Sequence, residues 1–221
     1  MKPSGRLDGY ASKSLLPRMQ LRGETKTSGD LPPASDERGN SRRRMDAREL
    51  SLTAIFAALY AVLVVFLLPV SFGPAQLRVA DALISLAALF GWPVVLGVTL
   101  GAVVSNIIGG LGVIDVVFGP VANLVAASLI FALRKRRFLA CVVGSLPIGF
   151  IVGAYLPLFF PPPEIFGLNL SPWLAMVISI TLSSLIAIAG IGYMLLTALS
   201  RPGVAKPLVA RGLKLYLGEE T

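Results

Sequence analysis

Long apolar stretches separated by short polar segments dominate the chain from Leu50 to Ser200. A helix needs roughly 20 mostly apolar residues to cross a bilayer. The pattern predicts six crossings, at residues 50–69, 78–90, 93–108, 115–133, 138–159 and 172–200. The second crossing is short and polar at its start, so we expect it to lean on other helices rather than to face lipid.

Composition agrees with a membrane-embedded chain, because 55% of the 221 residues are hydrophobic and only 14% are charged. We therefore predict an all-α integral membrane protein with a six-transmembrane-helix bundle at residues 50–200. Residues 1–49 mix charges with Pro, Gly and Ser and contain no long apolar run, which predicts a disordered cytoplasmic tail. Residues 201–221 are expected to form a cytoplasmic C-terminal tail.

The distribution of basic residues predicts how the chain is oriented in the cell membrane. Six crossings place both termini on one side, and that side also receives the basic run Arg134–Arg137. The opposite side holds isolated charges near the membrane edge, namely Arg78, Asp81, Asp115 and Glu164. Because basic residues concentrate in cytoplasmic loops, we expect both termini in the cytoplasm. The same bias accounts for the formal net charge of +8 without a nucleic-acid partner.

Several kinds of chemistry are excluded by what the sequence lacks. The chain has no histidine, which rules out a histidine base, a dyad of histidine with serine or cysteine, and a histidine-ligated metal. The phosphate-loop motif GxxxxGK followed by Ser or Thr does not occur, so the chain has no visible means of hydrolysing ATP. We expect no enzymatic activity, no metal site and no cofactor, and we interpret Cys141 as an inert buried thiol.

The segment Asn106–Gly119 places a carboxamide, a carboxylate and several glycines between two apolar stretches. Lipid penalises such groups unless protein or ligand satisfies them, so we expect the functional site here. The predicted topology places this segment at the outer end of the bundle, together with Arg78 and Asp81. These two charges lie three residues apart on one helix face, where they pair with each other, line a polar pocket, or do both.

Each remaining group of this region has two interpretations. Asp115 is either an N-cap or first-turn residue of the helix that starts there, where the helix dipole favours a carboxylate, or it accepts hydrogen bonds from a ligand. Asn106 either caps the preceding helix or contacts the edge of a heterocycle. Phe118 either belongs to the core or stacks on a flat ring, and Asn123 is a candidate for a hydrogen bond between helices. Glu164, in a Pro-rich loop, either belongs to a lid or is simply solvated.

Small residues recur at a spacing of four in the first crossing, as Ala54 with Ala58 and Ala57 with Ala61. Such a face lets another helix approach closely. The spacing leaves two alternatives open, which are packing within the bundle and docking of a separate membrane subunit.

Two stretches resemble a known family: PVSFGPAQLRVADAL at 69–83 and SNIIGGLGVIDVVFGPVANLVAA at 105–127. They are similar to the QueT family, which are substrate-binding S components of energy-coupling factor (ECF) transporters. The likeness extends weakly over the rest of 50–200, and residues 1–44 lie outside it. The resemblance implies a six-helix bundle that binds a vitamin-like solute at its outer side, here a queuosine precursor with a 7-deazaguanine-like base.

The resemblance also implies partners, which are membrane lipid, a transmembrane coupling protein and two ATPase subunits. Docking on the coupling protein is implied for Ala54 and Ala58. The alternatives are an S component for another vitamin or nucleobase, and a solitary secondary transporter.

A guanine-like ring has a polar edge and two flat faces. Asp115 and Asn106 suit the edge, because a carboxylate accepts and a carboxamide both donates and accepts hydrogen bonds. Arg78 or Phe118 suits the face. The predicted substrate-binding residues are Arg78, Asp81, Asn106, Asp115 and Phe118.

Overall fold

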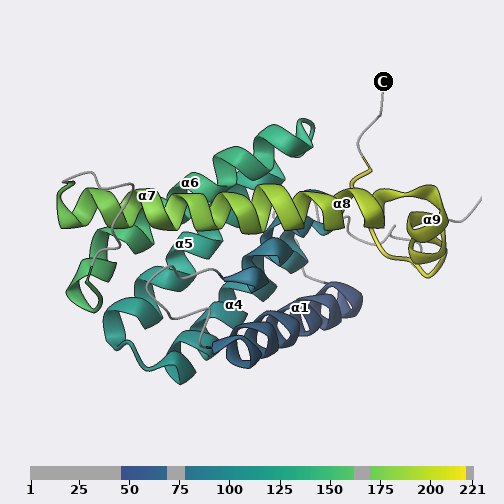
Figure 1. The fold of residues 1–221 in the computed structure, drawn as a ribbon. Helices are drawn as coiled ribbons and strands as arrows, with labels where there is room; N and C mark the ends of the chain where they lie inside the picture. The colour runs from purple at the N-terminus through teal and green to yellow at the C-terminus, as the bar shows by residue number, and fades with distance from the viewer. Residues whose placement is uncertain (1–45, 69–77, 162–169, 218–221) are drawn as a thin grey trace, which may run out of the picture. The chain divides into compact units, whose positions relative to one another are not determined.

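The computed structural model describes residues 46–68, 78–161 and 170–217. Most of the predicted N-terminal tail at 1–49 and the Pro-rich loop with Glu164 lie outside the described residues. Within the described ranges the secondary structure is helical and contains no strand, which confirms the predicted all-α class (Figure 1). Among these described residues, five helices are long and apolar enough to cross a membrane.

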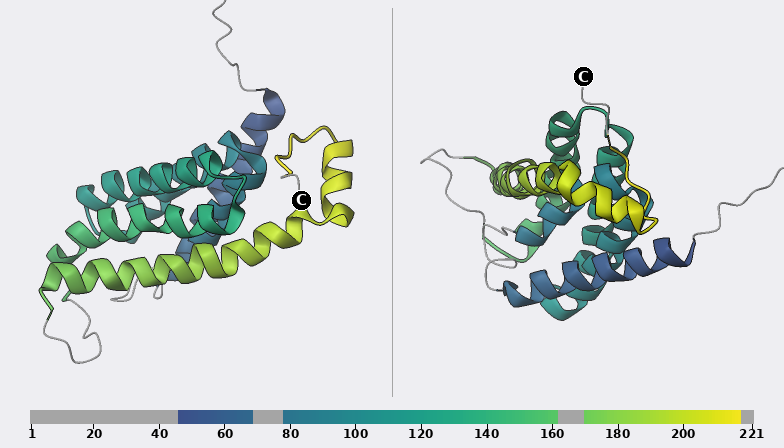
Figure 2. Two further views of the ribbon diagram at one scale, coloured as in Figure 1. Left: turned by 90° about the horizontal axis from the view of Figure 1, so that it is seen from above. Right: turned by 90° about the vertical axis from the view of Figure 1, so that its right-hand side faces the viewer.

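The five long helices match the predicted crossings closely. They are α1 (Ala47–Phe66), α4 (Trp92–Gly109), α5 (Val113–Ala132), α6 (Arg137–Tyr155) with its extension η2 (Leu156–Leu158), and α7 (Pro172–Ser184) continued by η3 (Leu185–Gly192) and α8 (Tyr193–Ser200). The last three segments run on as one rod of 29 residues (Figures 1 and 2). Its middle part, η3, is a π-helix.

The second predicted crossing differs from the others. It consists of η1 (Val79–Leu86), a 3-10 helix of 8 residues, followed by 4 residues of α-helix in α3 (Ala87–Phe90). This passage is shorter than a full span. All residues from Ala80 to Phe90 are buried, so other helices rather than lipid surround it, as its polar start predicts.

Short-range signals place the helix ends. The Asp46 carboxylate accepts a hydrogen bond of 2.8 Å from the Ala47 amide at the start of α1. The Ser171 hydroxyl oxygen accepts from the Leu174 amide over 3.4 Å at the start of α7, and Pro172 occupies the first position of that helix. Gly110, with φ of 73°, ends α4 in the left-handed conformation that glycine adopts at low cost.

Helices α1 and α4 pack tightly through two glycines. A Cβ on Gly97 would lie 2.7 Å from the Cβ of Phe56, and one on Gly101 would lie 2.7 Å from the Ala57 carbonyl oxygen. The two small-residue faces of α1 therefore differ in their exposure. Ala57 and Ala61 are half-buried, whereas Ala54 and Ala58 are exposed. The face with Ala57 and Ala61 thus packs within the bundle, and the face with Ala54 and Ala58 is not covered by it.

The two unusual helical segments, η1 and η3, contact each other. Ser85 Oγ lies 2.8 Å from the carbonyl oxygen of Ala82 and 2.8 Å from that of Gly192. A Cβ on Gly192 would lie 2.7 Å from the Ala82 carbonyl oxygen. The absence of a side chain at Gly192 therefore allows the short second passage to pack against the last helix.

Residues 202–217, part of the predicted C-terminal tail, fold back on the bundle. Helix α9 (Pro202–Ala210) leads into an extended segment whose Tyr216 amide donates a 2.8 Å hydrogen bond to the Leu89 carbonyl. The Arg134 guanidinium lies 4.7 Å from the ring of Phe131 and 5.0 Å from that of Tyr216. We name this end of the bundle, which carries Arg134–Arg137, the basic end.

Candidate functional site

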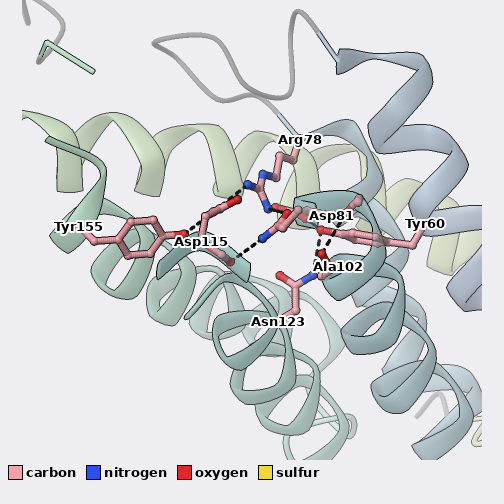
Figure 3. Close-up of polar contacts among 9 residues, drawn as sticks. Tyr60, Arg78, Asp81, Ala102, Asp115, Asn123 and Tyr155 are labelled. Carbon is pink, nitrogen blue, oxygen red and sulfur yellow. Dashed lines mark hydrogen bonds and ion pairs between the residues drawn. The ribbon is translucent and has the colours of Figure 1, made fainter. Parts of the chain in front are cut away.

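Three predicted site residues from three different segments meet inside the bundle, at the end opposite the basic end. Arg78 directly precedes η1, Asn106 lies near the end of α4, and Asp115 lies in the first turn of α5. Their side chains are buried, with relative exposures of 5%, 0% and 0%. We name this end the site end. Figure 3 shows the contacts that join them.

Arg78 reaches both of the other residues. Its Nη1 donates to the Asn106 Oδ1 over 3.2 Å, and its Nη2 lies 3.5 Å from the Asp115 Oδ1 (Figure 3). Removing two charges from water costs several kcal/mol per ion, which close pairing and further hydrogen bonds offset. The guanidinium is therefore held in one place before any ligand arrives.

Asn106 does not cap α4 with its side chain. The capping contact is made by Gly110, whose amide donates to the Asn106 backbone carbonyl over 3.2 Å. The Asn106 side chain turns inward, and its Nδ2 donates to the Asp115 backbone carbonyl over 2.8 Å. Gly119 makes room for this amide, because a Cβ at that position would collide with Asn106 Nδ2.

Asp115 lies in the first turn of α5, one of its two expected places in the helix, and it is not the N-cap. Gly112, with φ of 97°, occupies the cap position, and the Asp115 side chain makes its contacts away from the helix end. Its Oδ1 accepts a 2.6 Å hydrogen bond from the Tyr155 hydroxyl, at the end of α6. Its Oδ2 is buried and has no hydrogen-bond partner among the described residues. Buried acceptors are normally satisfied, so Oδ2 is left with acceptor capacity that the described residues do not use.

The cluster has the composition of a small-molecule site. It combines a cation, a carboxylate, a carboxamide and a phenol at one end of an apolar bundle, and such convergent polar groups orient a ligand. A family model for the QueT transporter matches residues 50–201. The chain belongs to the QueT transporter family. The matched residues comprise most of α1 and every later helix up to the end of α8, and this confirms the resemblance found in the sequence.

The family and the five apolar helices establish a multi-pass membrane transporter. No curated protein and no solved structure gives a significant match. Helix α9 and the extended segment after it lie outside the residues that the QueT model matches.

Asp81 belongs to a second polar group deeper in this QueT bundle. The Tyr60 hydroxyl on α1 donates to the Asp81 Oδ1 over 2.6 Å, and the Asn123 Nδ2 donates to the Tyr60 oxygen over 2.8 Å (Figure 3). The predicted hydrogen bond of Asn123 between helices is confirmed. The Asp81 side chain thus bonds to α1, and the charge of Arg78, one turn away, also attracts its carboxylate.

Phe118 is not part of the buried group. Its side chain is 49% exposed, and its ring centroid lies 6.3 Å from that of Tyr155. An open hollow of about 280 Å³ borders the site end, and its wall includes Asn106 together with apolar neighbours. The residues that line it are Asn106, Ile107, Gly110, Gly112, Val113 and Val116.

Sequence reasoning did not single out Tyr60 and Tyr155. Each lies in an apolar helix, where a tyrosine is equally suited to packing. The sequence did contain one indication of their role. A buried phenol needs a hydrogen-bond partner, and Asp81 and Asp115 need donors inside an apolar bundle.

Proposed function

We propose that this QueT-family chain is the substrate-capture (S) subunit of an ECF transporter that imports a queuosine precursor with a 7-deazaguanine-like base. The observation that carries the proposal is the buried group of Arg78, Asn106 and Asp115, in which Asp115 Oδ2 has no partner among the described residues. A site of this kind suits a flat, polar heterocycle better than an ion or a lipid tail.

The chemistry of the group fits the edge of such a ring. A 7-deazaguanine ring offers an N–H, a carbonyl and an exocyclic amine along one edge. In the proposal, Asp115 Oδ2 accepts a hydrogen bond from one of the two N–H donors. A heterocycle without that donor would leave the buried oxygen unpaired. The cost of this unpaired group is how the site rejects ring systems with the wrong pattern.

The proposed direction of transport follows from the charges. The basic end carries Arg134–Arg137 and Arg201, and we place it in the cytoplasm with both termini. The site end then faces the outside, where it captures the solute. The chain supplies no ATPase motif, so the proposal assigns energy input to two partner ATPases and not to an enzymatic activity of its own.

The proposed docking surface for the transmembrane coupling protein is the exposed Ala54–Ala58 face of α1. Its counterpart on the same helix, Ala57, is already used against Gly101 of α4. Small side chains on an exposed helix face allow a second helix to approach its backbone closely.

Titration of the detergent-purified full chain with 7-deazaguanine, guanine and a panel of vitamins tests the proposal. Saturable binding of the deazaguanine is expected. No binding of any deazaguanine, with binding of a vitamin instead, would reassign the chain to an S component for that solute. Uptake that persists in cells without any ECF ATPase would instead favour a solitary transporter.

A further inference from the structure

We infer that Tyr155 is a positioning and specificity-determining residue, which occupies one oxygen of Asp115 so that the ligand meets only the other. This inference rests on the proposed function and assigns a role to a residue outside the predicted site. It follows from the contacts at the two oxygens of a single carboxylate.

The two Asp115 oxygens have different surroundings. Oδ1 accepts from the Tyr155 hydroxyl over 2.6 Å and lies 3.5 Å from the Arg78 Nη2. Oδ2 is equally inaccessible to solvent, yet it has no hydrogen-bond partner among the described residues. Asp115 thus has one oxygen with two partners and one buried oxygen without a hydrogen-bond partner among the described residues.

The engaged oxygen limits what the carboxylate can bind. A carboxylate oxygen has about two acceptor positions, and Tyr155 with Arg78 fills both on Oδ1. A carboxylate whose two oxygens both lack a partner binds a pair of adjacent N–H groups in a bidentate fashion, one N–H on each oxygen. Asp115 instead offers a single acceptor, so it recognises one N–H of the ligand rather than two.

Tyr155 is well placed to hold this arrangement. It is the last residue of α6, its side chain is buried, and its ring has Phe118 and Phe159 as neighbours at centroid distances of 6.3 Å and 6.5 Å. Replacement by phenylalanine keeps the ring and its neighbours and removes only the hydroxyl. One acceptor position of Oδ1 then becomes open, and the carboxylate gains the ability to bind in this bidentate fashion.

The test compares two probes that differ by one group. The base 7-deazaguanine carries a ring N–H and an adjacent exocyclic amine, and 7-deazahypoxanthine carries the ring N–H alone. For the unchanged chain, Asp115 binds the ring N–H and not the exocyclic amine, so we expect the two dissociation constants to lie within about fivefold of each other. Loss of a hydrogen bond to a charged acceptor would instead change the affinity by more than about tenfold. For Tyr155→Phe, we expect weaker binding of 7-deazahypoxanthine and a preference for 7-deazaguanine that exceeds about tenfold.

Tyr193→Phe is the matched control, because Tyr193 is a half-buried tyrosine of α8 with an aromatic neighbour, Phe138, at 5.3 Å. It should leave both dissociation constants unchanged. A purely structural role of Tyr155 would weaken both probes equally, and an unchanged ratio therefore overturns the inference. If Tyr155→Phe does not fold, the two dissociation constants of the unchanged chain test the inference. A preference for 7-deazaguanine above about tenfold in that chain contradicts the claim that Asp115 offers a single acceptor. Binding of neither probe by the unchanged chain overturns the proposed function itself, and the inference with it.

Discussion

The hydroxyl of Tyr60 donates a 2.6 Å hydrogen bond to Oδ1 of Asp81, and both side chains are buried. This contact joins α1, the helix proposed to dock the coupling protein, to η1, the segment that follows Arg78. The proposed docking surface and the proposed substrate site are therefore linked through one short hydrogen bond.

Tyr60→Phe removes the donor to Asp81 and the acceptor of Asn123 in one step. We expect a loss of about 1–2 kcal/mol in the free energy of unfolding, because two buried polar groups lose a partner while the packing of the ring is kept. Thermal unfolding in detergent measures this, with Tyr193→Phe as the control. An unchanged unfolding temperature would show that the contact does not stabilise the bundle.

Asp115→Ala removes the carboxylate that the site is built around. We expect affinity for 7-deazaguanine to fall by about a hundredfold or more, equal to about 2.7 kcal/mol, with the helical content unchanged. Glu49→Ala, at the basic end, serves as the control carboxylate. Retention of full affinity in the Asp115 variant would remove this residue from the site.

Gly119→Ala tests whether the position of the Asn106 amide matters. A Cβ at 119 collides with Asn106 Nδ2, and the amide must move away from the Asp115 carbonyl and from Arg78. We expect binding to weaken on the order of tenfold, equal to about 1.4 kcal/mol. Gly190→Ala is the control, because the nearest atom to a Cβ there is 4.0 Å away. Equal affinities of the two variants would contradict the role given to Asn106.

Ala58→Trp places a large ring on the exposed face of α1. Uptake is expected to fall to background while the affinity for 7-deazaguanine stays unchanged, since the substitution lies outside the buried site. Val125→Trp, on the exposed part of α5, controls for a bulky residue in the membrane. Normal uptake in the Ala58 variant would assign docking to another surface.

The positions of the five long helices could be predicted from the sequence because long apolar stretches mark them. The polar groups that break the apolar pattern marked the candidate site, and Arg78, Asn106 and Asp115 do lie together. They lie together because each polar group in an apolar bundle needs a polar partner, and the sequence contains few other polar groups that could serve.

The details that could not be predicted depend on packing between distant segments. The 3-10 form of η1 is seen together with the contact of Ser85 to Gly192, which is 107 residues away. Gly110 and Gly112 occupy the cap positions considered for Asn106 and Asp115, because glycine adopts a positive φ at low cost, while Asp115 keeps its expected place in the first turn of α5. Tyr155 came from a third helix, and nothing in its local sequence pointed to Asp115.

The π-helical segment Leu185–Gly192 gives the last span two different helical phases. Each π-turn holds one residue more than an α-turn, so the side chains of α8 are rotated relative to the pattern that α7 begins. One residue corresponds to about 100° of rotation in an α-helix. Deletion of a single residue within 185–192 would therefore be absorbed by a return to α-helical geometry and would leave Tyr193 and Leu196 near their present azimuths. The same deletion within α7 would instead turn the residues that follow it by about 100°.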